Sequence, residues 1–354
     1  SAGNRIKKIL TKTEFLILWF VMAHGATLSF WIFVGFALIF QMIMGANDGG
    51  VLLGSIISSN FIHPVIAVVI LFLSLFCAPF IFGTAVVKTL GTKIFPIDHM
   101  NMAMLYATLF ATITWVIIAQ KIKYPVSISY TFVGALVGSG LASKYAHLIN
   151  ITEVYKVFAG LLVAIGISFA LGYLLLKLMN LTLLKASPKV SIVFRVLQVL
   201  TSILLVLGYG SNDAEKTLSL IYMAAIITHS PISPNAKSPI IVLGLAALFI
   251  IGTLLFGGNS AATSGFRIMK SNPKQTFLTQ FITSFTVLYF AKIGLPISST
   301  ETLNMGLVGV GYAEKPYSVK WHVVKNLLLT WTVTIPMSIF ISYVYTLIFQ
   351  LFIR

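Results

Sequence analysis

The sequence predicts an all-α polytopic membrane protein of about 10–12 transmembrane segments, built as two inverted-topology repeats with broken helices and re-entrant or hairpin segments. Three observations predict this fold. The 354-residue chain is 58% hydrophobic and only 9% charged, with a mean hydropathy of +0.98, whereas soluble domains are about 45–50% apolar and 25% charged. Its apolar runs approach the roughly 20 residues that cross a bilayer. Its polar motifs recur in the same order in both halves.

The chain begins with a basic stretch and a short apolar run, which together make up residues 1–27. Because this run leads directly into another apolar segment, we expect an interfacial or additional membrane segment and not a cleaved signal peptide. The first repeat then covers residues 28–178. Its expected membrane segments are 28–58, 61–82, 100–120, 127–142 and 154–178.

A short polar joint, residues 179–191 with Lys185, Pro188 and Lys189, connects this repeat to the second one, residues 192–354. The expected segments of the second repeat are 192–227, 239–256, 275–293, 297–313 and 322–350. Each half therefore has an odd number of crossings, provided that 127–142 spans the membrane. The second half must then be inserted upside down, as in the inverted repeats of secondary transporters.

One pair of matching motifs places carboxylates inside apolar runs. Asn47-Asp48 lies in the stretch 44–50, and Asn212-Asp213 lies in the stretch 209–215. An ionised carboxylate near the bilayer centre costs at least ~2.5–3.5 kcal/mol on insertion scales. Neighbouring glycines allow the helix to break, and irregular backbone is tolerated at that depth only where it lines a cavity. The two motifs therefore predict a shared ion-handling site.

The other pair of motifs is rich in hydroxyls and follows Pro125 and Pro296. Proline discourages helix before it and favours a fresh helix start after it. A hydroxyl-rich helix start offers free N–H groups and the positive end of the dipole, so it can hold an oxyanion without a fixed cation. The alternative is that these Ser and Thr side chains only cap their helices.

Charge connects the two pairs of motifs. An anion held in the same cavity as two carboxylates would be repelled even at an effective dielectric constant of about 20. Bound cations or protons must neutralise this repulsion, and carboxylate, amide and carbonyl oxygens are hard ligands that suit Na⁺. The residues therefore predict coupled transport of an anion with cations.

At these residues the sequence resembles the inorganic phosphate transporter family, the sodium-phosphate symporters often called PiT, from about Phe36 to Ile348. Each repeat of that family carries a Gly-x-Asn-Asp break and a Pro-Val-Ser-Thr-Thr-His turn. The resemblance implies a multi-pass protein of the cell membrane, not an enzyme, which carries inorganic phosphate with Na⁺ by alternating access and needs no organic cofactor. It implies sodium ligands at Asn47, Asp48, Asn212 and Asp213, and phosphate ligands at Ser127, Ser129, Thr131, Ser298, Ser299 and Thr300.

The chain departs from the family pattern after both Asn-Asp pairs and in the hydroxyl motifs, where Ile128 replaces a hydroxyl and Tyr130 and Glu301 stand where histidine is usual. A carboxylate beside a bound oxyanion must be protonated, cation-bound or turned away. Glu301, together with Glu215 of the second acidic motif, is therefore a candidate coupling or proton site. The simpler alternative is that backbone amides of its own helix start bind Glu301. These departures leave a proton-coupled phosphate or sulfate transporter as the alternative function.

Functions of other classes fit the motifs less well. An intramembrane aspartyl protease needs two aspartates that share a proton, but it has no use for duplicated asparagines or hydroxyl turns, and an ion channel needs no oxyanion site. The net charge of +16 suits anionic lipid headgroups. Nucleic-acid binding is not expected, because no soluble basic domain accompanies the charge. The oligomeric state stays open, a homodimer included.

Overall fold

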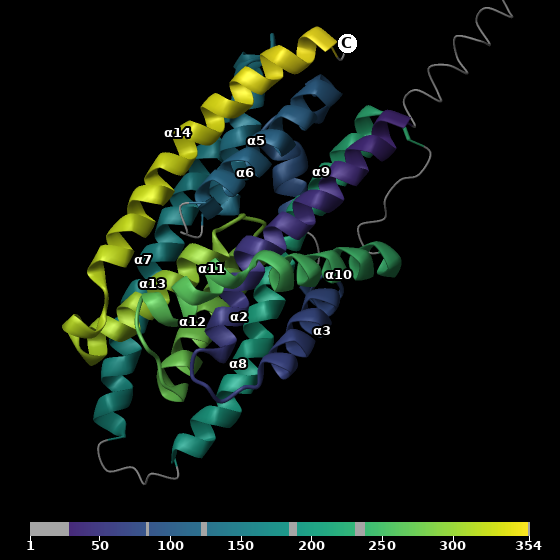
Figure 1. The fold of residues 1–354 in the computed structure, drawn as a ribbon. Coiled ribbons are helices and arrows are strands. Elements are labelled where there is room, and N and C mark those ends of the chain that lie inside the picture. Colours follow the sequence, from purple (N-terminus) through teal and green to yellow (C-terminus); the bar gives the residue numbers. More distant parts are fainter. Residues whose placement is uncertain (1–27, 83–84, 122–125, 184–189, 231–237, 353–354) are drawn as a thin grey trace, which may run out of the picture.

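The computed structural model describes residues 28–82, 85–121, 126–183, 190–230 and 238–352. The predictions for residues 1–27, Pro125 and residues 184–189 of the joint fall outside these ranges. Every regular element in the described part is helical (Figure 1). The predicted all-α fold is confirmed.

Seven helical stretches in the described part are long and apolar enough to cross a membrane: Leu28–Ile57, Pro64–Phe82, Met102–Lys121, Ile151–Thr182, Val190–Ile227, Pro239–Phe256 and Trp321–Phe352. This confirms a multi-pass membrane protein. Seven is fewer than the ten membrane segments expected from the sequence, because the other expected segments are short or rich in polar residues. Ile128–Leu141 has only 14 residues, and Pro273–Lys292 buries a row of Gln, Thr and Ser side chains.

The first half runs from Leu28 through a π turn, η1 (Gly45–Gly49), into α2 (Gly50–Ile57). It continues with α3 (Pro64–Phe82), α4 (Ala85–Lys88), the π turn η2 (Thr89–Lys93), the 3₁₀ turn η3 (Ile97–His99), α5 (Met102–Lys121), α6 (Ile128–Leu141), the 3₁₀ turn η4 (Ala146–Leu148) and α7 (Ile151–Thr182).

The second half follows the same order. It consists of α8 (Val190–Asn212), α9 (Ala214–Ile227), α10 (Pro239–Phe256), α11 (Gly258–Ala262), the π turn η5 (Thr263–Arg267), α12 (Pro273–Lys292), α13 (Ser299–Glu314), the 3₁₀ turn η6 (Pro316–Ser318) and α14 (Trp321–Phe352). Corresponding helices agree in length: α5 and α12 have 20 residues each, and α7 and α14 have 32 each. The matched short elements, α4 with η2 and α11 with η5, lie outside the membrane segments expected from the sequence.

The two acidic motifs differ in backbone. At Asn47-Asp48 the expected break is a π turn, through which the helix continues into α2. A π turn adds one residue to the helix and is common at functional sites. It keeps Gly45 packed so closely on α10 that a Cβ there would collide with the carbonyl oxygen of Phe249. At the second motif the break is present, because Asp213 alone separates α8 from α9.

The halves interlock through their last helices. α7 packs against α13, and α14 packs against α6, so each long final helix lies on the hydroxyl-started helix of the other half. Both contacts are close and corresponding: a Cβ on Gly138 would meet the carbonyl oxygen of Ile339, and one on Gly309 would meet that of Phe169.

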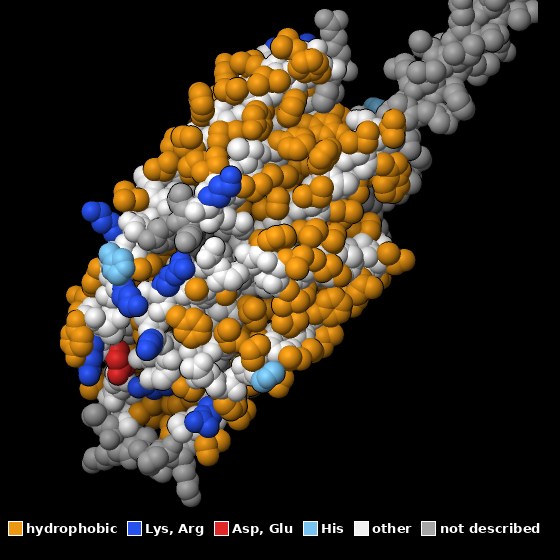
Figure 2. Space-filling model, in the orientation of Figure 1, with side chains coloured by type: hydrophobic (Ala, Val, Ile, Leu, Met, Phe, Trp, Pro, Cys, Tyr) orange, Lys and Arg blue, Asp and Glu red, His pale blue; other side chains and the backbone are white. Residues whose placement is uncertain are grey.

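Hydrophobic side chains cover much of the face that Figure 2 shows, and Lys and Arg gather over part of it. Polar side chains of both acidic motifs and both hydroxyl motifs are instead buried in the interior. The fold therefore places a polar cluster inside an apolar shell.

Candidate functional site

Two serines begin the helices that follow the prolines. Ser127 precedes α6 and its hydroxyl oxygen accepts a hydrogen bond from the N–H of Tyr130, at 3.1 Å. Ser298 precedes α13 and accepts from the N–H of Glu301, at 3.3 Å. Both serines therefore act as helix caps, as the alternative interpretation expected. Each hydroxyl still has its own hydrogen to donate.

Thr131 is used differently from the other predicted phosphate ligands. Its hydroxyl donates to the carbonyl oxygen of Ser127 at 2.7 Å, and Thr302 donates to the carbonyl oxygen of Ser298 at the same distance. This local bonding back to the preceding turn is typical of Thr in a helix. The Thr131 donor is therefore engaged by the backbone.

Each asparagine of the acidic motifs clamps the residue that precedes a capping serine. The Asn47 amide nitrogen donates to the carbonyl oxygen of Val126 at 2.7 Å, and the N–H of Val126 donates back to the Asn47 amide oxygen at 3.2 Å. Asn212 does the same with Ile297, at 2.7 and 3.3 Å. The asparagines thus hold the start of each hydroxyl helix in place.

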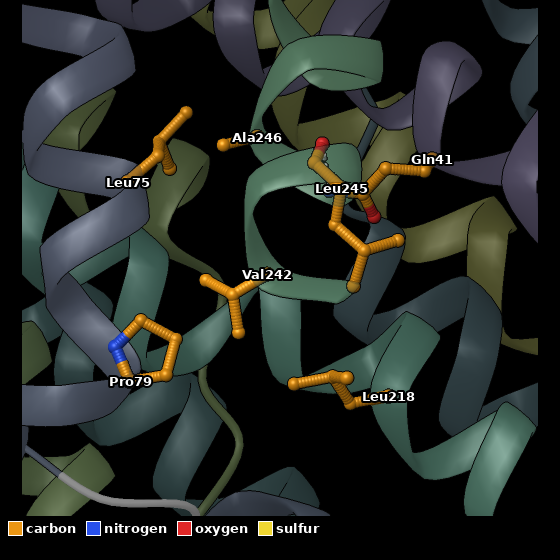
Figure 3. A pocket seen from close by; sticks show the side chains of 7 residues that line it. All are labelled: Gln41, Leu75, Pro79, Leu218, Val242, Leu245 and Ala246. Carbon is orange, nitrogen blue, oxygen red and sulfur yellow. Dashed lines mark hydrogen bonds between the residues drawn. The ribbon is translucent and has the colours of Figure 1, made fainter. Parts of the chain in front are cut away.

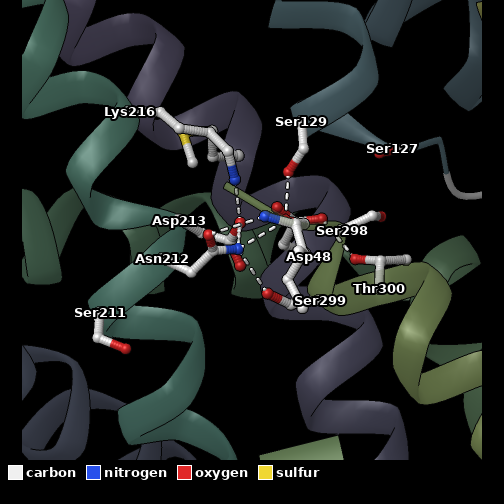
Figure 4. A network of polar contacts seen from close by, with 12 residues as sticks. Asp48, Ser127, Ser129, Ser211, Asn212, Asp213, Lys216, Ser298, Ser299 and Thr300 are labelled. Atoms are coloured by element: carbon white, nitrogen blue, oxygen red, sulfur yellow. Dashed lines mark hydrogen bonds and ion pairs between the residues drawn. The ribbon is translucent and has the colours of Figure 1, made fainter. Parts of the chain in front are cut away.

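Asp48 joins the two halves of the molecule. Its Oδ1 accepts from the Thr300 hydroxyl at 2.7 Å and from the Asn47 amide at 2.8 Å. Ser129 also reaches the other half, because its hydroxyl donates to the carbonyl oxygen of Ile297 at 2.6 Å. An acidic motif from one half and hydroxyls from both halves therefore meet in one cluster (Figure 4).

Asp213 has a charged partner. Its Oδ1 forms an ion pair with the ammonium group of Lys216, one turn further along, and faces the Asn212 amide at 3.3 Å. Its other oxygen, Oδ2, is buried without a hydrogen-bond partner in the described part of the chain. Lys216 is fully buried. Lys216 was not among the predicted site residues, although its three-residue spacing from Asp213 on a helix was a usable signal.

Two further residues complete the cluster. The Ser299 hydroxyl oxygen accepts from the Asn212 amide at 3.0 Å. Tyr209 is fully buried, and its hydroxyl makes no hydrogen bond of good geometry among the described residues. Tyr209 begins the second acidic motif but was not predicted as a site residue. Ser211, in the same motif, donates to the carbonyl oxygen of Gly208 and points away from the cluster (Figure 4).

The two candidate coupling glutamates lie in different settings. Glu301 is fully buried beside the hydroxyls of Tyr130 and Ser127, yet neither of its oxygens makes a hydrogen bond of good geometry within the described ranges. No backbone amide of its own helix binds it. Glu215 instead accepts from the N–H of Val87 at 3.0 Å, near the start of the short helix α4. Its carboxylate therefore has a structural partner in the other half.

A separate pocket lies between α3, α9, α10 and the helix that begins at Leu28. It is lined by Leu75, Pro79, Leu218, Val242, Leu245, Ala246 and Gln41 (Figure 3). Its single polar side chain is already engaged, because the Gln41 amide donates to Leu245 and accepts from Thr217. This pocket offers nothing to an anion. The polar cluster around Asp48 and Asp213 remains the candidate site.

Comparisons with known proteins show which proteins the chain is similar to. Residues 44–342, which contain the whole cluster, match the family model of the phosphate transporter family. The chain is 31% identical to a probable low-affinity inorganic phosphate transporter of Rhizobium meliloti (strain 1021), over 90% of this chain and 96% of that protein. It is 28% identical to a protein of the same description from Bacillus subtilis (strain 168), over 85% and 91%.

A solved structure titled "The sodium-dependent phosphate transporter" has a similar fold, with a TM-score of 0.81. The alignment covers 92% of this chain and 100% of that one, at 20% sequence identity. At this identity the likeness concerns the fold alone.

Proposed function

The chain belongs to the phosphate transporter family, and on that premise we propose that it carries inorganic phosphate across the membrane by symport with cations, Na⁺ above all. It is a transporter and not an enzyme, so the two aspartates serve ion binding and not peptide cleavage. Phosphate and Na⁺ are its cargo, and no organic cofactor takes part.

One observation carries the proposal: the hydrogen bond from Thr300 to Asp48. It joins a hydroxyl that suits an oxyanion to a carboxylate that suits a cation, and the two groups come from different halves of the chain. A phosphate at the hydroxyls and a cation at Asp48 would therefore be neighbours. Each would reduce the cost of burying the other, because opposite charges attract strongly in buried surroundings.

Phosphate would be held by the hydroxyls and free amides at the starts of α6 and α13. Ser129 and Thr300 now donate to Ile297 and Asp48, and these donors can turn to phosphate oxygens. Ser127, Ser298 and Ser299 have hydroxyls that accept hydrogen bonds from N–H groups, so their own hydrogens are available to donate. Thr131 stays a predicted ligand that must first release the Ser127 carbonyl.

Sodium fits the first acidic motif by the chemistry of its donors. Asp48 supplies a carboxylate, Asn47 an amide oxygen, and Thr300 a hydroxyl oxygen, all hard ligands. The π turn adds backbone carbonyls whose hydrogen-bonding pattern departs from that of an α-helix. The corresponding role of Asn212 and Asp213 stays a prediction.

Transport would proceed by alternating access. Only 2% of Asp48 and 3% of Asp213 is exposed, so the cluster is closed to both sides in this conformation. Cargo can reach it only if helices move apart, and the two matched halves offer one moving unit for each side.

The proposal is tested by uptake of ³²P-phosphate into liposomes that contain the purified protein. Phosphate should accumulate under an inward Na⁺ gradient, and neither K⁺ nor choline should replace Na⁺. Unlabelled arsenate should compete, and sulfate should compete poorly. Ser211→Ala is the matched control, because this hydroxyl lies in the motif but points away from the cluster. Uptake that only equilibrates phosphate, whatever the gradient, would contradict symport.

Glu301 supports a second candidate, in which the driving ion is H⁺. A buried carboxylate with no hydrogen-bond partner is costly to leave charged, so a proton on Glu301 that travels with phosphate is chemically reasonable. The same liposomes distinguish the candidates. A pH gradient, acidic outside, would then drive accumulation in the absence of Na⁺.

A further inference from the structure

We propose that Lys216 is a tethered cation that takes the place of a bound Na⁺ at Asp213, so that only the first acidic motif takes up a cation from solution. This inference deepens the proposed function and rests on it. It concerns how many cations accompany each phosphate, a number that decides how steeply the carrier can concentrate its cargo.

The geometry of the second motif supplies the first step. The Lys216 ammonium contacts Asp213 Oδ1, and the side chains are exposed by only 1% and 4%. Asp213 lies between α8 and α9, and Lys216 lies in the first turn of α9. The positive charge is therefore covalently attached one helical turn from the carboxylate. Asp213 has a counter-charge without any ion from solution.

The free oxygen of the Asp213 carboxylate does not favour Na⁺. Oδ2 is buried and is the only carboxylate oxygen of this motif without a hydrogen-bond partner in the described structure. A sodium ion at Oδ2 would stand beside the ammonium group. Like charges at such a distance repel strongly in buried surroundings.

The first motif differs at the corresponding position. Three residues after Asp48 the chain has Val51, a fully buried aliphatic side chain. The partners of Asp48 are neutral, namely the Asn47 amide and the Thr300 hydroxyl. Lys216 forms its ion pair with Asp213, whereas Asp48 forms no ion pair with a described residue. The Lys216 ammonium is near enough to act on Asp48 electrostatically, but it is paired with Asp213. Asp48 therefore has no contacting counter-charge and can take an exchangeable cation.

The number of charges moved with each phosphate tests this inference. The purified protein is reconstituted into liposomes with fixed phosphate and Na⁺ gradients, and the membrane voltage is varied. The voltage at which net phosphate flux is zero gives the charge moved with each phosphate. Lys216→Gln leaves Asp213 without its counter-charge, so the variant should recruit one more cation. We expect the charge per phosphate to rise by about one, and the Hill coefficient for the driving cation to rise with it.

Two variants serve as controls. Lys216→Arg keeps a tethered cation and should keep the parent's charge per phosphate. The double variant Lys216→Met/Asp213→Asn removes both charges and should also keep it. Binding of ²²Na⁺ to the detergent-purified protein provides a readout that needs no transport. Lys216→Gln should bind one more Na⁺ than the parent protein, while Asp48→Asn should lose the parent's site.

The outcomes separate this inference from the proposed function. If the parent shows no Na⁺-driven uptake, sodium symport is wrong, but the charge per phosphate still counts protons and still tests Lys216. If Lys216→Gln moves and binds the same number of cations as the parent, the tethered-cation inference is overturned. A Lys216→Arg variant that changes the count would overturn it as well.

Discussion

The asparagines of the two acidic motifs make the same contacts, whereas their carboxylates have different partners. Asn47 and Asn212 clamp Val126 and Ile297 with the same pair of hydrogen bonds, so both motifs hold a hydroxyl-started helix. Their carboxylates differ, because Asp48 bonds a hydroxyl of the other half and Asp213 bonds a lysine of its own half. The comparison teaches that duplicated positions can keep a scaffold role while their charge chemistry diverges. The predictions that follow test this division.

The largest expected difference concerns stability. Asp213→Asn leaves the Lys216 ammonium buried without a counter-charge, which typically costs about 3–5 kcal/mol. Asp48→Asn removes a carboxylate that has only neutral partners, so it should not lower stability. Thermal unfolding of the detergent-purified variants should show a clear drop for Asp213→Asn alone. The double variant Lys216→Met/Asp213→Asn should restore most of it, and equal melting temperatures for both single variants would remove the distinction between the motifs.

The second prediction concerns transport through Asp48. Asp48→Asn forfeits a charged ligand, and losses of this kind cost about 3 kcal/mol, or roughly 100-fold in affinity. Concentrative ³²P-phosphate uptake should therefore fall to background while the protein stays folded. Ser211→Ala in the second motif is the control with parental uptake. Undiminished accumulation by Asp48→Asn would exclude Asp48 as the cation ligand.

The third prediction tests the shared scaffold role. Asn47→Ala and Asn212→Ala each remove two hydrogen bonds to backbone, worth about 1–2 kcal/mol together. At saturating Na⁺, which offsets the loss of Asn47 as a sodium ligand, both variants should lower the apparent phosphate affinity by similar factors, on the order of 10-fold. Uptake measured over a range of phosphate concentrations gives these values. Effects that differ by more than tenfold would show that the two clamps are not equivalent.

A smaller effect is expected from Glu301 and Tyr130, which occupy corresponding positions in the two hydroxyl motifs and lie next to each other. If Glu301 carries a coupling proton, parental uptake should rise as external pH falls. Glu301→Gln should flatten this dependence and keep phosphate binding, whereas Tyr130→Phe should keep the slope. Asp48 and Asp213 lie in the same cluster (Figure 4), so the slope is also measured in the Asp48→Asn and Asp213→Asn backgrounds. An unchanged pH profile in Glu301→Gln would make this residue structural.

The smallest effect on uptake is expected from single cysteines in exposed loops, which test whether the two halves have opposite orientations in the membrane. Asp98 and Lys270 are exposed residues in corresponding loops of the two halves. Single cysteines at these positions, in a Cys77→Ser background, should react with impermeant reagents from opposite sides of the membrane and leave uptake intact. Lys270 is preferable to Asn272, because Asn272 forms the capping box of α12. Labelling from one side only would indicate parallel repeats.

The long helices and most of the polar cluster could be predicted from the sequence, because polar residues inside a membrane segment cost free energy and are therefore rare. Asn-Asp pairs in apolar runs and hydroxyls after prolines are rare enough to locate both halves of the cluster. Apolar length located the long helices for the same physical reason. The asparagine clamps could not be predicted, since a side chain that bonds a backbone some 80 positions away leaves no local pattern.

Other details depended on tertiary packing. The π turn at Gly45–Gly49 packs closely on α10, a tertiary contact, whereas the glycines alone predicted only a break. Lys216 was visible in the sequence, but its spacing from Asp213 equally suits an exposed ion pair on a helix. Burial, which decides its role, arises only when α9 is enclosed by other helices.

The exchange of final helices has a consequence for biogenesis. α6 lies against α14, nearly 200 residues later in the chain, and α7 lies against α13. The first half is therefore synthesised before α14, and the surface of α6 that contacts α14 stays exposed to lipid until the end of the chain is made. Contacts so distant in sequence form late. Truncation within α14 should accordingly expose α6 to the quality-control proteases of the membrane, even though every residue of the first half is present.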